Sequence, residues 1–261
     1  MKLVGVDTGG TFTDLVFFDG KAITVWKTPS TPDDPARAVL EGLTRFPEKA
    51  AVVHGSTVAT NAFLERKGAR VIFYTTAGFE DLIEIGRQAR GSLYDLGWKR
   101  DEPLVHPRDR IGVKERMGPD GKVILPLEKV PKRKKGSIAV GFLHSYANPL
   151  HEKEVARQLG GEVTLSSEVL PEYREYERFS TTVLNAYVRP VMSGYVHHLQ
   201  EKVKRPFSLM SSAGGTMSSE AAAERPVHTL LSGPAGGIAA ALSLGIEKLI
   251  TFDMGGTSSD V

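Results

Sequence analysis

The chain has 261 residues, which is enough for one large domain or two smaller ones. Its 33 basic and 31 acidic residues leave a formal net charge of only +2, which argues against a polycationic, nucleic-acid-binding surface. The sequence contains no cysteine, so disulfides, thiolate metal sites and cysteine nucleophiles are excluded. No apolar run reaches the ~18 residues of a membrane span and no signal peptide is recognised, so we expect a cytoplasmic protein that does not bind membranes.

Strand and helix patterns alternate along the first third of the chain. The segment from Val4 to Phe18 has the pattern of strand, tight turn and strand, and a third strand is predicted at 22–27. A helix is predicted from about Asp33 to Phe46, with Asp33 and Asp34 suited to an N-cap and an acidic first turn. Short β-rich runs flank a helical segment and predict a βαβ unit in a mixed or parallel sheet. These three segments are 50–54, 56–67 and 70–75.

The remaining two thirds continue the alternation around a less periodic region. The Pro-rich segment 87–136 predicts a peripheral insertion of loops and short strands. A long helical pattern over 172–203 contains Pro190, which we expect to kink or split the helix. The other predicted elements are strands at 138–143, 207–210 and 248–252 and helices at 149–159 and 233–244. This alternation predicts an α/β fold.

One turn sequence occurs twice. Asp7-Thr8-Gly9-Gly10-Thr11-Phe12-Thr13-Asp14 follows the first strand, and Asp253-Met254-Gly255-Gly256-Thr257-Ser258-Ser259-Asp260 follows the last predicted strand. Both copies have Asp, any residue, Gly-Gly-Thr, any residue, a hydroxyl residue and Asp. A single copy would fit an ordinary β-hairpin turn equally well. Two copies indicate an internal duplication.

The duplicated turn has the chemistry of a phosphate-binding loop. Two glycines remove the side chains that would shield consecutive N–H groups, so these groups can converge on a phosphate, and threonine adds hydroxyl donors. A carboxylate repels phosphate, so Asp7 and Asp253 are expected to act through Mg²⁺ or by orienting a water molecule. The predicted phosphate-binding residues are Gly9, Gly10, Thr11 and Thr13 in the first copy and Gly255, Gly256 and Thr257 in the second.

A second group of candidates lies where the strand at 50–54 meets the next helix. The sequence His54-Gly55-Ser56-Thr57 falls where ligands collect in open α/β sheets, and Asn61 lies one helical turn further on. The alternative interpretation is that Ser56 simply caps the helix. Arg87 offers a guanidinium group for a carboxylate or a phosphoryl group, and a solvated surface position is its alternative. The sequence contains neither a G-x-S-x-G elbow nor a P-loop, which disfavours a serine hydrolase and a P-loop NTPase.

Two Asp-x-Gly-Gly-Thr turns at the starts of two related α/β domains resemble the phosphate-1 and phosphate-2 loops of the actin, Hsp70 and sugar-kinase ATPase superfamily. More detailed motifs occur along the whole chain, at Val6–Asp14, His54–Ala62, Phe79–Arg90, Ser145–Pro149, Arg174–Tyr187, Leu231–Gly237 and Phe252–Val261. Through these motifs the chain resembles, within that superfamily, the hydantoinase A/5-oxoprolinase family over its whole length.

The resemblance implies a fold and a division of the chain. The expected fold is the first lobe of an actin-like (ribonuclease H-like) ATPase with peripheral α+β insertions, truncated at the start of the second lobe. Residues 1–180 would be the N-terminal domain with the phosphate-1 loop, and residues 181–261 would begin the ATPase domain that ends at the phosphate-2 loop.

The resemblance also implies an activity, with ATP and Mg²⁺ as cofactors. The expected reaction is ATP-dependent ring opening of a cyclic amide such as a hydantoin or 5-oxoproline, through phosphorylation of the amide oxygen. Asp7, Asp253, His54 and Arg87 would be catalytic, with both aspartates at the metal, and Ser56, Thr57 and Asn61 would face the substrate. The expected partners are a C-terminal ATPase lobe and a hydantoinase B-type subunit. An acetone carboxylase-like ketone carboxylase is the alternative, and a third is that this chain alone is an inactive binding or assembly module.

Overall fold

The computed structural model describes residues 2–89, 91–92, 94–99, 101–132, 135–254 and 259–261. It divides the chain into two compact units, residues 1–67 together with 188–261 and residues 68–187. The expected division at residue 180 falls inside one helix, α6 (Glu175–Lys202), and stays a prediction. Among the described residues no helix has both the length and the apolar character that crossing a membrane requires.

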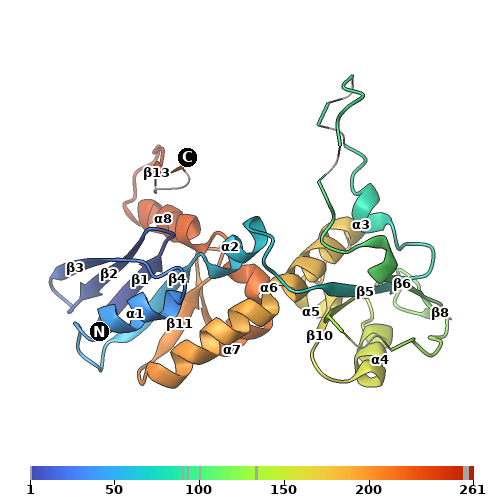
Figure 1. The fold of residues 1–261 in the computed structure, drawn as a ribbon, viewed down its shortest axis with the longest axis horizontal. Helices are drawn as coiled ribbons and strands as arrows, with labels where there is room; N and C mark the ends of the chain where they lie inside the picture. The colour runs from blue at the N-terminus through green and yellow to red at the C-terminus, as the bar shows by residue number, and fades with distance from the viewer. Residues whose placement is uncertain (1, 90, 93, 100, 133–134, 255–258) are drawn as a thin grey trace. The chain divides into compact units, whose positions relative to one another are not determined.

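The first unit is built on a mixed six-stranded sheet (Figure 1). Its strand order is β12-β11-β4-β1-β2-β3, in which β4 runs parallel to β1 and β11 while the other pairs are antiparallel. The strands are β1 (Leu3–Thr8), β2 (Phe12–Phe18), β3 (Ile23–Pro29), β4 (Ala51–Ser56), β11 (Phe207–Met210) and β12 (Thr216–Ser218).

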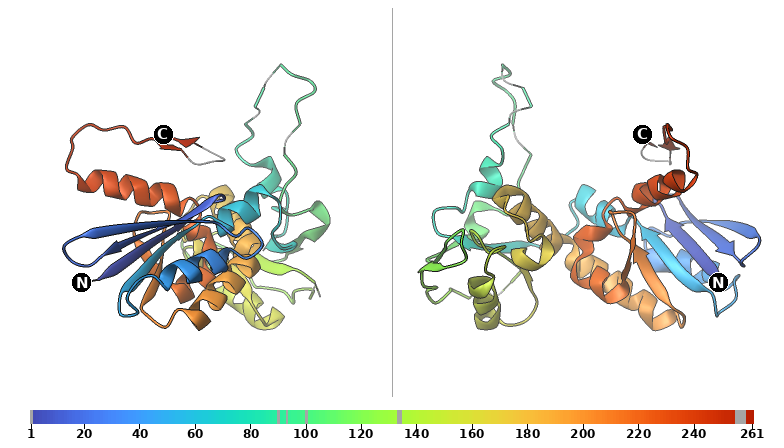
Figure 2. Two further views of the ribbon diagram at one scale, coloured as in Figure 1. Left: turned by 60° about the vertical axis from the view of Figure 1, so that its left-hand side comes forward. Right: turned by 180° about the vertical axis from the view of Figure 1, so that it is seen from behind.

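Helices cover the two faces of this sheet. The remaining elements of the unit are α1 (Pro35–Leu43), α2 (Val58–Leu64), α7 (Ser219–Glu224), η2 (Pro226–Thr229), α8 (Ser232–Ser243), β13 (Asp253–Met254) and β14 (Ser259–Asp260). Helix α1 packs on the face that carries Leu15, which is fully buried and lies against Gly42. Helix α8 lies on the opposite face of the sheet (Figure 2). On that face Gly233 approaches the Asp7 carboxylate. Side chains of a strand alternate between faces, so Asp7 and its neighbour Val6 point in opposite directions.

The second unit has its own sheet and core. Its four parallel strands have the order β10-β9-β5-β6. Its elements are β5 (Val71–Thr76), α3 (Leu82–Ile85), η1 (Pro107–Asp109), β6 (Arg110–Val113), β7 (Arg116–Met117), β8 (Val123–Leu125), β9 (Ser137–Gly141), α4 (Leu150–Leu159), β10 (Val163–Leu165) and α5 (Ser166–Val169). Tyr74, Val140, Phe142 and Val155 belong to one buried cluster between sheet and helix. The unit is thus a small α/β layer structure inserted into the first.

Two predictions about elements are wrong, and a third, that Pro190 kinks or splits the long helix, is wrong in its second part. The strands at 50–54 and 70–75 do not form one βαβ unit, because β4 and β5 belong to different sheets. Pro190 does not split the long helix, since α6 continues through it, and the fully buried Val188 and Met192 on either side hold it in place. Residues 248–252 form no strand; Ile250 and Phe252 are exposed there, and no described strand pairs with this segment.

Candidate functional site

The turn between β1 and β2 is held in place by Ser30. The Ser30 hydroxyl donates to the Gly9 carbonyl oxygen over 2.8 Å, and the Ser30 N–H donates to the Thr11 carbonyl oxygen over 2.9 Å. The Gly9 N–H bonds across the turn to the carbonyl oxygen of Phe12. In the described part of the chain, the N–H groups of Gly10 and Thr11 have no hydrogen-bond partner. The turn therefore presents two free donors on a fixed backbone, as an anion site requires.

Thr13 stabilises this turn through a hydrogen bond to Ser30. Its side chain is fully buried, and its hydroxyl lies 3.0 Å from the Ser30 hydroxyl. Because the Ser30 proton is given to Gly9, Thr13 is the donor in this contact. Its predicted contact with a nucleotide stays a prediction, whereas the structure uses its hydroxyl to fix the turn.

Asp7 lies beside the turn, near the C-terminal end of the central strand β1, and is exposed there. It pairs with Asp14 of β2 and with Gly55 of β4 in the strand register. Surrounding protein removes part of its hydration and raises the pKa of the Asp7 carboxyl, and repulsion from Asp14 and Asp253 raises it further. A Cβ on Gly55 would lie 2.9 Å from an Asp7 carboxylate oxygen, so that glycine leaves room for the carboxylate. A cation beside Asp7 would therefore stabilise the charged form of its carboxylate.

The short strands on either side of the second copy pair with each other in an antiparallel manner. Strand β13 pairs with β14 so that Asp253 lies opposite Asp260, as Asp7 lies opposite Asp14 in the first copy. The effect of Asp253 on the pKa of Asp7 places the two predicted metal-binding aspartates in electrostatic contact. The predicted phosphate-binding residues Gly255, Gly256 and Thr257 lie outside the described residues.

His54 is fully buried and is not among the described residues that line the cavity presented below. Its Nδ1 lies 3.2 Å from the Val6 carbonyl oxygen, and its Nε2 lies 2.6 Å from the Tyr195 hydroxyl. Burial lowers the pKa of His54 to about 4, so the ring is neutral at pH 7. A carbonyl oxygen only accepts, so Nδ1 carries the proton and Nε2 accepts a hydrogen bond from Tyr195. The predicted catalytic role of His54 stays a prediction; its observed contact orients Tyr195.

The residues that follow β4 are bonded to one another and to β1. The Ser56 hydroxyl is buried and accepts from the Val58 N–H, but helix α2 begins one residue later than a Ser56 cap would require, with Thr57 at the N-cap position. The Thr57 hydroxyl donates to the Thr8 carbonyl oxygen over 2.9 Å, and the Asn61 amide donates to the Thr57 hydroxyl over 3.3 Å. Thr57 and Asn61 are therefore linked to the strand that carries the turn.

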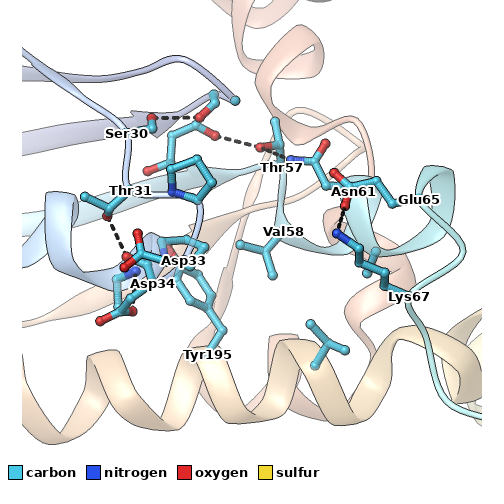
Figure 3. Close-up of a pocket in the computed structure, with 18 of the residues that line it drawn as sticks. Ser30, Thr31, Asp33, Asp34, Thr57, Val58, Asn61, Glu65, Lys67 and Tyr195 are labelled. Atoms are coloured by element: carbon cyan, nitrogen blue, oxygen red, sulfur yellow. Dashed lines mark hydrogen bonds and ion pairs between the residues drawn. The ribbon is translucent and has the colours of Figure 1, made fainter.

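A cavity of about 590 Å³ opens beside these residues within the first unit (Figure 3). Four segments enclose it: the Thr8–Gly10 turn, residues 30–36, the first turns of α2 and the C-terminal part of α6. Of the sequence-predicted site residues, it brings together Gly9, Gly10, Thr57 and Asn61. Asp33, Asp34, Glu65 and Lys67 supply its charges, and Lys67 is ion-paired with Glu65 at 2.6 Å.

Some lining residues were not predicted from the sequence. Ser30 lies in a Pro-rich segment that indicated only a turn, and a hydroxyl between two prolines was its one signal. Tyr195 and His198 lie in a long helical pattern in which nothing local marks them. They line the cavity together with residues of α2 that are far away in the sequence, so their position results from long-range packing.

Arg87 lies in the second unit, and its guanidinium group is bonded to Glu177. The Arg87 side chain is exposed, and it holds the pKa of the Glu177 carboxyl below its usual value. Its proposed role at the substrate remains a prediction.

Two family regions match the chain. Residues 3–163 match the hydantoinase/oxoprolinase N-terminal region, and residues 178–261 match the hydantoinase/oxoprolinase family. An uncharacterized protein of Methanocaldococcus jannaschii is 40% identical over 98% of this chain and 42% of its own length. Caprolactamase subunit alpha of Pseudomonas jessenii is 32% identical over 99% of this chain and 42% of its own. The 5-oxoprolinase of Saccharomyces cerevisiae is 31% identical over 99% of this chain and 25% of its own length. The chain thus spans less than half the length of these relatives.

Solved structures show the same similarity in three dimensions. The crystal structure of the ATP-dependent caprolactamase from Pseudomonas jessenii superposes with a TM-score of 0.80 at 33% identity, over 98% of this chain and 42% of that one. The nucleotide-free acetone carboxylase structure gives a TM-score of 0.75 at 27% identity, over 94% of this chain and 41% of that one. The predicted α/β fold of an actin-like ATPase lobe is thereby confirmed. With its matched regions covering most of the sequence, the chain belongs to the hydantoinase/oxoprolinase family.

Proposed function

We propose that this chain forms the part of an ATP-dependent cyclic-amide hydrolase that holds the phosphates and the acceptor amide. The observation that carries the proposal is the turn between β1 and β2. It presents the free N–H groups of Gly10 and Thr11, follows directly on Asp7, and contributes Gly9 and Gly10 to the lining of a cavity. The names of two relatives, a caprolactamase and a 5-oxoprolinase, supply the class of reaction.

The residues around Asp7 fit a magnesium ion. Mg²⁺ is commonly held by one or two carboxylates, with phosphate oxygens and water completing its shell. Among the described residues, no three acidic or histidine side chains gather into a complete protein-made metal site. The Asp7 carboxyl has a raised pKa and lies beside free N–H donors. It therefore suits a magnesium ion that is held by one or two carboxylates together with phosphate oxygens and water. Asp7 and Asp253 would hold the ion, which would neutralise phosphate charge when bound.

In the proposed reaction the protein positions groups and needs no nucleophilic side chain. Phosphoryl transfer from ATP to the amide oxygen makes the carbonyl carbon electrophilic enough for water to open the ring, with release of ADP and phosphate. The Gly10 and Thr11 N–H groups would bind phosphate oxygens as preorganised donors. Thr57 and Asn61 would hold the acceptor in the neighbouring cavity. A second subunit is proposed as a partner, because the caprolactamase relative is itself named as a subunit.

The similarity to acetone carboxylase favours one other candidate, an ATP-dependent ketone carboxylase. A single experiment separates the two. The complete protein that contains this chain, with its second subunit, is given Mg·ATP and either cyclic amides or acetone with bicarbonate. We expect cyclic amides to stimulate ADP release, whereas stimulation by acetone and bicarbonate alone would favour the carboxylase.

The role of Asp7 is tested in the same assay. Asp7→Asn keeps the size of the side chain but removes the negative charge, and we expect ADP release to fall at least about a hundredfold. Asp19→Asn is the matched control, because Asp19 lies at the opposite end of the hairpin and binds only its own turn. Unchanged activity in Asp7→Asn would contradict the metal role.

A further inference from the structure

The cavity beside the Thr8–Gly10 turn has a composition that selects among cyclic amides. We propose that this cavity binds an uncharged cyclic amide and discriminates against one that carries a carboxylate. The inference rests on the proposed function, because the glycines of the phosphate-binding turn line the same cavity and would set the amide oxygen beside the transferred phosphoryl group.

The cavity suits a small ring with an amide edge. Its volume of about 590 Å³ lies in the usual range for small-molecule sites and exceeds the size of a five- to seven-membered ring. Val58, Ala62 and Val191 supply apolar wall for methylene groups. Asn61 donates one N–H to Thr57, which leaves its second N–H and its carbonyl oxygen for a ligand. A lactam presents a carbonyl and an N–H on the same side, so it is complementary to such a carboxamide.

The charges around the cavity are predominantly negative. Figure 3 shows Asp33 and Asp34 on one side of the cavity and the Glu65–Lys67 pair on the other. Lys67 is the only lysine or arginine among the described lining residues, and its ammonium group is already paired with Glu65. Asp33 is paired with Arg37 on the outer surface, whereas Asp34 accepts only the backbone N–H of Ala36 in capping α1.

The negative charge of Asp34 acts electrostatically on a residue of the cavity lining. Besides the larger effect of burial, it contributes to raising the pKa of the hydroxyl of Tyr195, a residue that lines the cavity. A substrate carboxylate in the same space would be repelled in the same way, and no free cation of the lining would compensate it. The substrate of this protein is therefore assigned to the class of neutral lactams and imides, and 5-oxoproline, which bears a carboxylate, is disfavoured.

The test compares two probes that share one ring. 2-Pyrrolidinone and 5-oxoproline are the same five-membered lactam without and with a carboxylate. The complete protein with its second subunit is assayed for ADP release with each probe, and each is also measured as a competitor of whichever cyclic amide gives the fastest release. We expect 2-pyrrolidinone to bind at least about tenfold more tightly than 5-oxoproline.

Asp34→Asn shows whether charge is the cause. Asparagine still caps a helix, so α1 is preserved while the charge is removed. We expect the preference for 2-pyrrolidinone to shrink about threefold to tenfold, through tighter binding of 5-oxoproline alone, with the KM for ATP unchanged. Glu41→Gln is the matched control, because Glu41 is an exposed carboxylate of the same helix outside the cavity. Asn61→Leu should weaken the binding of 2-pyrrolidinone and of 5-oxoproline to the same extent.

The outcomes separate this inference from the function on which it rests. Equal binding of the two probes, a preference for 5-oxoproline, or an unaltered preference in Asp34→Asn overturns the selectivity and leaves the hydrolase intact. If no cyclic amide stimulates ADP release, the proposed function itself fails.

Discussion

Asp7 has two properties that suit the proposed role at a metal ion. It is exposed near the end of a central strand, yet neighbouring protein and two further aspartates disfavour the charge of its carboxylate. The space around it is kept open by glycine, since Gly55 and Gly233 both face the carboxylate. At the scale of single residues, the site is therefore defined as much by side chains that are missing as by those that are present.

Gly55→Ala is expected to move the Asp7 carboxylate without unfolding the protein. The added methyl group would lie 2.9 Å from a carboxylate oxygen, and the side chain of Asp7 yields more easily than the sheet backbone. We expect ADP release by the complete protein to fall about tenfold, with a higher Mg²⁺ requirement. Gly5→Ala is the control, because a methyl group there meets only the Val16 carbonyl oxygen at 3.9 Å. Equal effects of the two substitutions would contradict the interpretation.

His54 should make the stability of the chain depend on pH. Its pKa is about 4 in the folded protein and 6.5 in the unfolded chain, so the unfolded state binds the proton first as the pH falls. The stabilising contribution of neutral His54 is complete above pH 6.5 and is lost by up to about 1.4 kcal/mol per pH unit down to pH 4. Urea unfolding at several pH values measures this slope.

The slope is assigned to His54 by comparing variants. His54→Asn should flatten the dependence between pH 6.5 and 4, whereas replacement of the exposed His197 by Gln should not alter it. Parallel curves for His54→Asn and the unchanged chain would show that other groups cause the acid sensitivity.

At the scale of elements, helix α4 is anchored by one buried carboxylate. Glu152 is fully buried, and its two oxygens accept hydrogen bonds from the Phe142 N–H, the Ser166 hydroxyl, and the N–H and hydroxyl of Ser167. The guanidinium group of Arg178, also buried, donates to the same Ser166 hydroxyl and to the Phe142 carbonyl oxygen. This network joins α4, the end of β9, α5 and α6 within the second unit. The sequence predicted these helices and strands by their periodicity, but no local pattern marks Glu152 as buried.

Glu152→Ala is expected to destabilise the second unit by about 3 to 5 kcal/mol, because four donors and a buried guanidinium group lose their acceptor or counter-charge. Glu154→Ala on the same helix removes an exposed pair with Arg157 and should have a far smaller effect. Thermal unfolding followed by circular dichroism compares the two. Similar losses would mean that the network contributes little.

At the scale of the whole molecule, the chain consists of two units, one of which is inserted into the other. Residues 68–187 form a continuous segment with its own parallel sheet and its own buried cluster. The first unit is discontinuous and comprises residues 1–67 and 188–261. All residues that line the 590 Å³ cavity come from this first unit.

The second unit is expected to fold when residues 68–187 are expressed alone. Its core includes Ile72, Tyr74 and Phe142, each nearly or completely buried, and all its sheet pairings are internal. We expect one cooperative thermal transition and a dispersed amide NMR spectrum from this fragment. In Phe142→Ala the midpoint temperature of this transition should fall sharply, since such a truncation lowers the free energy of unfolding by about 3 to 5 kcal/mol. A fragment without a cooperative transition would contradict the assignment of an independent core.

The sequence by itself determined the family of this protein and the repeated turn on which the proposed function rests. The repeated Asp-x-Gly-Gly-Thr turn, the order of most strands and helices, and the family follow from local patterns, and local patterns are fixed by backbone geometry and side-chain type. The tertiary structure decided which sheet each strand joins, that His54 is buried behind Tyr195, and that Asp34, Asn61 and Tyr195 share one cavity. Those features depend on contacts between residues far apart in the chain, which are selected by the packing of the whole core and leave no signal in a short window of sequence.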